Sequence, residues 1–341
     1  MAPSRTTLLL GALLLTGATP APTASPSPID VLRDAMRAPQ RVSYVGEVAV
    51  LRIGTQRSQV EIYRIEHRAP GMTRRWYTAP QALYGDSMIT RGATTYSIDV
   101  KRQRAVISSG DDTDQQIAAR GNFGILLANY DAVYAPSTTT IDGRPTIVVL
   151  LNNKYTGQTT VRVHIDAKTH LILERQQFAP NGSVIAQMRF EQLRYTNAIP
   201  TGVFEIPAGL ARVDDTAHDT ESTDVAHAIS TAGFPALEPR YLPEGFRPVA
   251  GDVATIKSVP TLHLLYSDGI RTISLFQNER NAAIDLSHFR ALPTTVAHHP
   301  AQYVEDGSTT LLAWSDGNRH FALVGDLSLS ELEEIGASVL P

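Results

Sequence analysis

The clearest pattern along the chain is an alternation of apolar and polar residues in two segments, 161–166 and 184–191. The apolar positions are Val161, Val163, Ile165, Val184, Ala186, Met188 and Phe190. A period of two residues is typical of a β-strand that buries one face. Turn-forming residues at 166–169 and at Asn181-Gly182 enclose a third run, 171–178, and Asn-Gly favours a type I′ hairpin. The pattern predicts consecutive antiparallel strands.

More β-rich runs come before this region, at 43–53, 58–67, 87–91, 94–100, 105–108 and 145–151. Apolar residues at helical spacing predict a short helix over 29–37 and a weaker one over 115–130, which Gly121 and Gly124 interrupt. A sheet must cover its apolar face, and two short helices cannot cover so many strands. We therefore expect an α+β fold. Its first domain is a curved antiparallel sheet, or half-barrel, with helices on the concave side and an apolar hollow.

A polar, acidic segment over 210–224 separates this domain, 29–209, from a second one, 225–341. Such a composition is typical of a linker. Asp224 can cap a short helix, and Ser328 with Glu331 forms a capping box before a helix over 329–339. The strands that we expect in between lie at 253–256, 262–266, 272–276, 309–314 and 320–324. The second domain is therefore expected to be a small α+β domain.

The N-terminus has the layout of a secretory signal peptide, which we place at 1–24. Arg5 precedes the apolar run 8–15, and small residues follow it. That run is too short to span a membrane, which takes about 20 residues. An N-terminal anchor that stays uncleaved is the alternative. With a cleaved signal the mature protein is secreted across the inner membrane and is soluble in the periplasm or cell envelope.

Composition removes several classes of function. The 341 residues carry a net charge of −4, which argues against a nucleic-acid partner. There is no cysteine, so disulfides, thiolate metal sites and cysteine nucleophiles are excluded. The sequence contains no phosphate-binding loop, no nucleophile elbow and no zinc-protease motif.

The remaining candidates for metal binding or catalysis are weak. His263, His288, His298 and His299 could in principle hold a metal, but the last three lie in a Pro/Thr/Ala-rich connection without a carboxylate at ligand spacing. A surface loop is the favoured interpretation. No nucleophile with its base can be named. We expect no metal, no cofactor and no enzymatic activity, and pattern alone indicates a secreted two-domain binding protein.

Several short motifs, in order, resemble the MucB/RseB family of periplasmic regulators of an envelope-stress sigma factor. The first domain carries SYVGEV at 43–48, YRIEHR at 63–68 and then Gly71. The second carries YLPEGF at 241–246 and LYSDG at 265–269. Residues 163–178, Asn181-Gly182 and 199–207 resemble the sheet of the lipoprotein carriers (LolA-like), whose fold the family's first domain shares. From WSDG at 314–317 onwards, the chain resembles sensor domains of other anti-sigma systems equally well.

The resemblance implies a partner. Members of this family bind the extracytoplasmic part of a membrane anti-sigma factor and shield it from proteolysis, and lipid or misassembled envelope material is thought to release that protection. Our first hypothesis is a negative regulator and sensor of this kind, which binds an anti-sigma factor and a lipid. A periplasmic lipid or lipoprotein carrier is the alternative, and an enzyme is a distant third.

Two sets of candidate site residues follow. An acyl chain would bind in the hollow of the first domain, against Trp76, Phe123, Val161, Val163, Ile165, Val184, Met188 and Phe190. A plain apolar core is the competing interpretation for these side chains. The family resemblance places the partner on the second domain, where aromatic side chains beside turns offer anchors. These are Tyr241, Phe246, Tyr266 and Trp314, and packing against the last helix is their alternative role.

Overall fold

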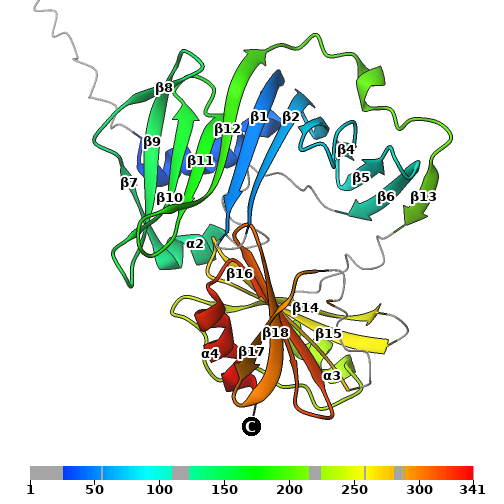
Figure 1. The fold of residues 1–341 in the computed structure, drawn as a ribbon. Helices are drawn as coiled ribbons and strands as arrows, with labels where there is room; N and C mark the ends of the chain where they lie inside the picture. Colours follow the sequence, from blue (N-terminus) through cyan, green and yellow to red (C-terminus); the bar gives the residue numbers. More distant parts are fainter. Residues whose placement is uncertain are drawn as a thin grey trace, which may run out of the picture.

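The computed structural model describes residues 26–54, 57–109, 123–214, 224–256, 259–279, 286 and 289–340. They form two domains, each built on one twisted sheet, and the smaller domain lies below the open side of the larger one in Figure 1. The expected signal peptide at 1–24 lies outside the described residues, as does much of the expected second helix. Among the described residues no helix is long and apolar enough to cross a membrane.

The first sheet is a long meander in which neighbouring strands are antiparallel, except for the terminal parallel pair β13 and β6. Its order is β13-β6-β5-β4-β3-β2-β1-β12-β11-β10-β9-β7, with β8 also paired to β9. The strands are β1 (Tyr44–Ile53), β2 (Ser58–Arg68), β3 (Met72–Ala79), β4 (Ser87–Arg91), β5 (Thr94–Asp99), β6 (Arg104–Ser109), β7 (Tyr130–Tyr134), β8 (Thr139–Ile141), β9 (Arg144–Asn153), β10 (Thr159–Asp166), β11 (Ile172–Phe178), β12 (Val184–Tyr195) and β13 (Ala211–Asp214).

The concave face of this sheet is covered by α1 (Pro28–Arg37) and α2 (Phe123–Asn129). Ser27 caps α1 by accepting the backbone N–H of Asp30, and Pro28 occupies the first turn, where its missing N–H costs nothing. The buried side of α1 packs Val31 and Leu32 against the strands. Short 3₁₀ turns follow at Ala38–Gln40 (η1) and Thr201–Phe204 (η2), and η2 covers the opposite face over β4 to β6.

The second sheet has the order β14-β15-β16-β20-β19-β18-β17. Helices α3 (Val225–Thr231) and α4 (Leu329–Val339) pack on one of its faces. Asp224 caps α3, and Ser328 with Glu331 forms the expected capping box of α4. The strands are β14 (Arg247–Ile256), β15 (Val259–Ser267), β16 (Thr272–Asn278), β17 (Leu292–Val296), β18 (His299–Asp306), β19 (Thr309–Ser315) and β20 (His320–Gly325).

The fold confirms the expected α+β class, with a curved first sheet and a small second domain. Six strands were not expected: β3, β7, β8, β13, β17 and β18. Residue 130 begins β7 instead of ending a helix, and His299 begins a strand instead of lying in a loop. The first sheet also extends through β13, so 211–214 pair with β6 although they were assigned to the linker.

Candidate functional site at the junction of the two domains

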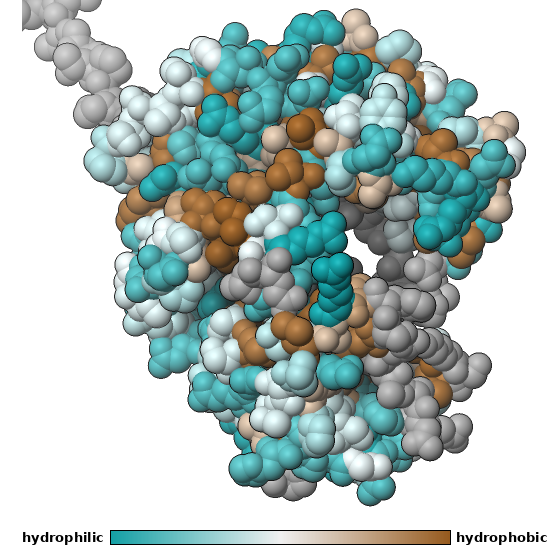
Figure 2. Space-filling model, in the orientation of Figure 1, coloured by the Kyte–Doolittle hydropathy of each residue, from teal (hydrophilic) through white to brown (hydrophobic). Residues whose placement is uncertain are grey.

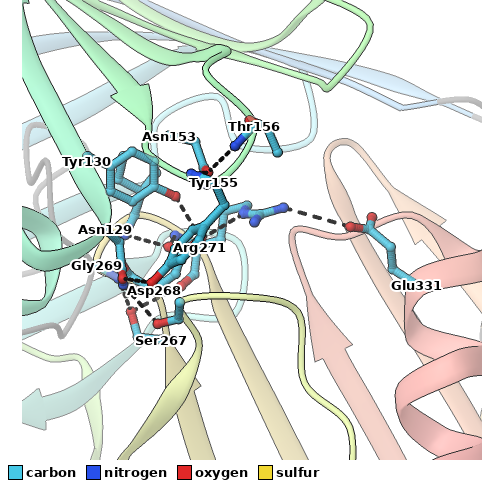
Figure 3. A network of polar contacts seen from close by, with 12 residues as sticks. Asn129, Tyr130, Asn153, Tyr155, Thr156, Ser267, Asp268, Gly269, Arg271 and Glu331 are labelled. Carbon is cyan, nitrogen blue, oxygen red and sulfur yellow. Dashed lines mark hydrogen bonds and ion pairs between the residues drawn. The ribbon is translucent and has the colours of Figure 1, made fainter.

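The turn between β15 and β16 carries a network of polar contacts at the domain junction (Figure 3). The Oδ1 atom of Asp268 accepts the backbone N–H groups of Ile270 at 2.9 Å and Arg271 at 2.7 Å. The guanidinium of Arg271 donates to Oδ2 of the same carboxylate at 3.0 Å. Ser267 bonds across the turn to Arg271 O and Gly269 N. The local sequence SDGxR thus builds a rigid turn from its own side chains.

Residues of α2 and β7 in the first domain form hydrogen bonds to this turn and its neighbourhood. The hydroxyl of Tyr130 donates to Oδ2 of Asp268 at 2.7 Å. The amide nitrogen of Asn129 donates to two carbonyls of the second domain, Gly245 O at 2.8 Å and Asp268 O at 2.9 Å. Ile270, at the tip of the turn, is only 2% exposed and belongs to the core of the first domain. Figure 2 shows apolar side chains gathered near α2, on the side that faces the second domain.

Burial makes this network electrostatically strong. Asp268 is fully buried, and its carboxylate accepts four hydrogen bonds. Burial, and then the neighbouring Asp268 carboxylate, raise the pKa of Tyr130, so its hydroxyl stays protonated and donates. Burial opposes the charge of Arg271, but Asp268 outweighs it and raises the pKa of the guanidinium. A buried charge without partners is costly in free energy. Because Asp268 receives one of its hydrogen bonds from Tyr130 of the first domain, the network favours one arrangement of the two domains.

The second domain contains the same turn twice. Between β19 and β20, Ser315 and Asp316 repeat the contacts: Asp316 accepts the backbone N–H groups of Asn318 and Arg319, and the Arg319 guanidinium bonds back to it. The second copy carries an exposed Asn318 where the first carries Ile270. The repeated SDGxR pattern is the sequence signal that could have revealed this site. The apolar Ile270 in the first copy distinguishes the turn that enters the junction.

A second contact joins the domains at the β1–β2 hairpin. Gln59 bonds to Asp306, and Gly307 packs against Gly54 and the side chain of Arg52. Nearby, Asp326 accepts the hydroxyl of Thr309 at 2.9 Å, and burial raises the pKa of Asp326 against the opposing effect of first-domain arginines. The junction is thus held at two places along the second sheet.

A cleft of about 230 Å³ opens beside the SDGxR turn and lies between the domains. From here on it is called the junction cleft. Two tyrosines from different domains stand in it with much of their surface free: Tyr155 is 50% exposed and Tyr241 is 42% exposed. Its wall is formed by Asn153, Tyr155, Thr156, Gln158, Thr159, Thr160, Phe178, Ala179, Pro180, Tyr241, Pro243, Glu244, Arg271 and Glu331.

Hydrogen bonds hold the side chain of Tyr155 and the backbone of Tyr241. The hydroxyl of Tyr155 donates to the amide oxygen of Asn129, whose nitrogen holds the second domain, so the cleft and the junction share one hydrogen-bond network. The backbone of Tyr241 is held to the end of α4, because its N–H donates to Ser338 Oγ at 3.1 Å. The side chain of Tyr155 is held in advance and therefore loses little freedom on binding.

A larger groove of about 880 Å³ lies on the face of the first sheet opposite α1. Trp76 stands in it, 39% exposed, between the guanidinium groups of Arg64 and Arg74. The ion pair of Arg74 with Glu66, at 3.6 Å, and the further carboxylates of Glu47 and Asp142 balance the charge there.

The expected acyl-chain residues do not surround an open hollow. Val161, Val163, Ile165, Met188 and Phe190 are almost fully buried in one core with the apolar side of α1. Phe123 packs on that core, Val184 is partly exposed, and Trp76 lies on the other face of the sheet. Helix α1 fills the space on the concave side that we expected to be hollow, because its small and branched side chains pack into the curve of the sheet. Lipid binding stays a prediction.

Of the four expected partner residues, the structure leaves one on the surface. Phe246, Tyr266 and Trp314 are buried in the core of the second domain, where Trp314 stacks on Phe321 beneath α4. These three are corrected to core residues, since they pack in one apolar cluster with residues of α3 and α4, and Trp314 lies against Gly336 of α4. Tyr241 is exposed in the junction cleft. The site residues that sequence reasoning missed are Asn129, Tyr130, Tyr155, Ile270 and Arg271.

The structure also brings together a serine, a histidine and an aspartate that the sequence keeps apart. His263 bonds to Asp252 through Nδ1 and to Ser274 through Nε2, each at 3.0 Å, across β14, β15 and β16. Its ring stacks on Phe276 with centroids 4.4 Å apart. We interpret this series of hydrogen bonds as a structural link between the three strands, since neither cavity described above includes these residues.

Comparison with known proteins accounts for most of the chain. Residues 27–208 match the family model of the MucB/RseB N-terminal domain, and residues 236–339 match a domain of unknown function, DUF4367. Among curated proteins none matches.

Solved structures share the fold across both domains. The structure of MucB in complex with MucA(peri) is 18% identical, covers 92% of this chain and 98% of its own, and gives a TM-score of 0.62. The complex of MucA and MucB from Pseudomonas aeruginosa is 17% identical with the same coverage and a TM-score of 0.64. A crystal structure of MucB is 18% identical, covers 91% of this chain and 96% of its own, and gives a TM-score of 0.52.

Proposed function

The chain belongs to the MucB/RseB family, and we propose that it is an extracytoplasmic negative regulator that binds the extracytoplasmic segment of a membrane anti-sigma factor. The observation that carries this proposal is the two-domain fold that the chain shares with MucB, whose structure was determined with MucA(peri) bound. A bound segment would be shielded from proteolysis, because a protease must reach an extended, accessible chain.

The junction cleft is the place where we expect the partner to bind. It lies between the two domains and offers one exposed tyrosine from each. Tyrosine is enriched at interface hot spots, because it buries a large area with few rotatable bonds and keeps a polar end. A segment bound there would contact both domains at once, so its affinity would depend on the arrangement that the Asp268 turn holds.

Capture of the partner tests this function. The full chain with a C-terminal tag is recovered from the envelope fraction of the source cells after mild cross-linking, and the bound proteins are identified by mass spectrometry. We expect a membrane anti-sigma factor that the wild type enriches and Tyr241→Ala does not. Recovery of no anti-sigma factor by the wild type would overturn the proposal.

We further propose that the protein reaches the periplasm or cell envelope through a cleaved signal peptide at 1–24. The sequence order of Arg5, apolar run and small residues supports this. The intact mass of the protein from the extracytoplasmic fraction checks it: a mass that begins between residues 19 and 25 is expected. A mass that includes residues 1–15 would contradict cleavage.

A further inference from the structure

The wall of the junction cleft that belongs to the second domain is acidic around its exposed tyrosine. Glu244 lies three residues after Tyr241, and Glu331 lines the same cleft from α4. Glu334 is exposed on α4, one turn before the Ser338 to which the backbone of Tyr241 bonds. Together with burial, the charges of Glu334, Glu331 and Glu244 raise the pKa of the Tyr241 phenol. Two glutamates of the cleft wall, and Glu334 one helical turn from Ser338, therefore lie close to Tyr241.

The basic groups near this ring are already engaged. Arg271 bonds to Asp268 at 3.0 Å and approaches Glu331 at 3.9 Å. Arg240, next to Tyr241 in the chain, turns its guanidinium to the carbonyls of Ser338 and Leu340 at the end of α4. Glu244 and Glu334 are exposed, and their charge faces the solvent that a partner would displace. A net negative potential is thus left at the cleft mouth.

From this geometry we infer that the partner segment held in the junction cleft is basic, and that one of its Lys or Arg side chains lies over the ring of Tyr241 between Glu244 and Glu334. The inference rests on the proposed function and adds the chemistry of the partner to it. A cation over an aromatic face is attracted by the ring electrons, and flanking carboxylates strengthen that attraction. A neutral or acidic segment would leave the exposed carboxylates of Glu244 and Glu334 uncompensated beside it.

In-cell photo-cross-linking identifies the segment directly. The full chain carries p-benzoylphenylalanine in place of Tyr241 or, for comparison, in place of Trp76 in the groove of the first sheet. We expect an adduct from position 241 with the anti-sigma factor, on a peptide of net positive charge with Lys or Arg next to the linked residue. An adduct on a neutral or acidic peptide, or adducts from position 76 only, would overturn the inference and leave the proposed function standing. Failure to recover any anti-sigma adduct would remove both.

Charge reversal then measures the contribution. A synthetic peptide of the cross-linked sequence is titrated with the wild type and with Glu244→Lys/Glu334→Lys, which alters no contact that holds the fold. Exposed ion pairs contribute up to about 1 kcal/mol each, so we expect binding to weaken about tenfold at low salt and less at 0.5 M NaCl. Glu205→Lys, an exposed glutamate on the first domain, should bind as the wild type does. Equal affinity of the double variant and the wild type would overturn the inference.

Discussion

A β-carbon on Gly269 would lie 2.5 Å from the backbone nitrogen of Leu126. Gly269 belongs to the turn of the second domain and Leu126 to α2 of the first, so the backbones of the two domains meet without an intervening side chain. Gly269 also has a φ of +98°, which L side chains rarely adopt. The junction therefore depends on a glycine for two independent reasons.

Gly269→Ala should destabilise the protein more than Gly317→Ala. Gly317 holds the same place in the duplicate turn with a φ of +102°, but nothing lies within 4 Å of its added β-carbon. Backbone strain of about 1–3 kcal/mol is common to both variants. The clash with α2 is confined to Gly269→Ala and adds about 1–3 kcal/mol of overpacking. Urea unfolding compares the two, and equal losses would contradict the described contact.

Ile270→Asn should lower the free energy of unfolding by about 2–5 kcal/mol, because it removes an apolar side chain from the first-domain core and buries an amide there. Asn318→Ala, at the matching place of the exposed turn, should change stability by less than about 0.5 kcal/mol. Small-angle X-ray scattering should also show a larger radius of gyration for Ile270→Asn alone. An unchanged scattering curve together with unchanged stability would refute the insertion of Ile270.

Tyr130→Phe should lower the free energy of unfolding by about 1–3 kcal/mol, because it removes one hydrogen-bond donor from the buried Asp268 carboxylate while it keeps the aromatic ring. Tyr134→Phe is a control on the same strand: Tyr134 is exposed and bonds to the carbonyl of Pro26. Thermal unfolding should give a lower Tm for Tyr130→Phe than for Tyr134→Phe. The reverse order would show that the bond to Asp268 does not stabilise the junction.

The first domain should lose stability as the pH falls from about 6.5 to 4. Burial, and then the charges of Arg162 and Arg189, lower the pKa of His164 to about 4, so the unfolded chain takes up a proton in this range and the folded one does not. The loss is at most about 3 kcal/mol. Buried Glu174, whose pKa is raised, works in the opposite direction.

His164→Gln isolates that effect. The glutamine can still bond to Thr139, which contacts His164 Nδ1 at 2.8 Å, but it has no titrating group. The variant should show a shallower fall in unfolding free energy than the wild type between pH 6.5 and 4.5. Identical slopes would contradict a neutral His164 in the folded state.

The sequence predicted those parts of the fold whose cause is local. The alternation at Val163 and Met188 identified both strands and the faces that they bury. The alternation did not reveal β3, because the polar Arg75 occupies a buried position of this strand, next to Arg74. The guanidinium of Arg75 lies over the ring of Tyr63. The alternation also failed at β17 and β18, where Ala297 and His298 form a tight turn with positive φ, which glycine usually occupies.

The candidate site was harder to predict, because it joins distant parts of the chain. The hairpin turn at Asp268 was expected, but its partner Tyr130 lies 138 residues away and was assigned to a helix. Tyr266 and Trp314 looked like surface anchors because they precede turns, but both are buried in the core of the second domain, Trp314 beneath α4. Local chemistry fixes the shape of the turn, whereas the packing of two domains decides which side chains stay exposed.

The central claim is that the junction cleft holds the extracytoplasmic segment of an anti-sigma factor through Tyr241. Isothermal titration of the full chain with that purified segment tests it most directly, with Tyr241→Ala and Tyr84→Ala side by side. Tyr84 is 55% exposed on the first domain, away from the residues that line the cleft. We predict one-to-one binding that Tyr241→Ala weakens at least about tenfold, as expected for a hot spot, and that Tyr84→Ala leaves unchanged. The absence of wild-type binding, or an equal effect of both variants, would contradict the account.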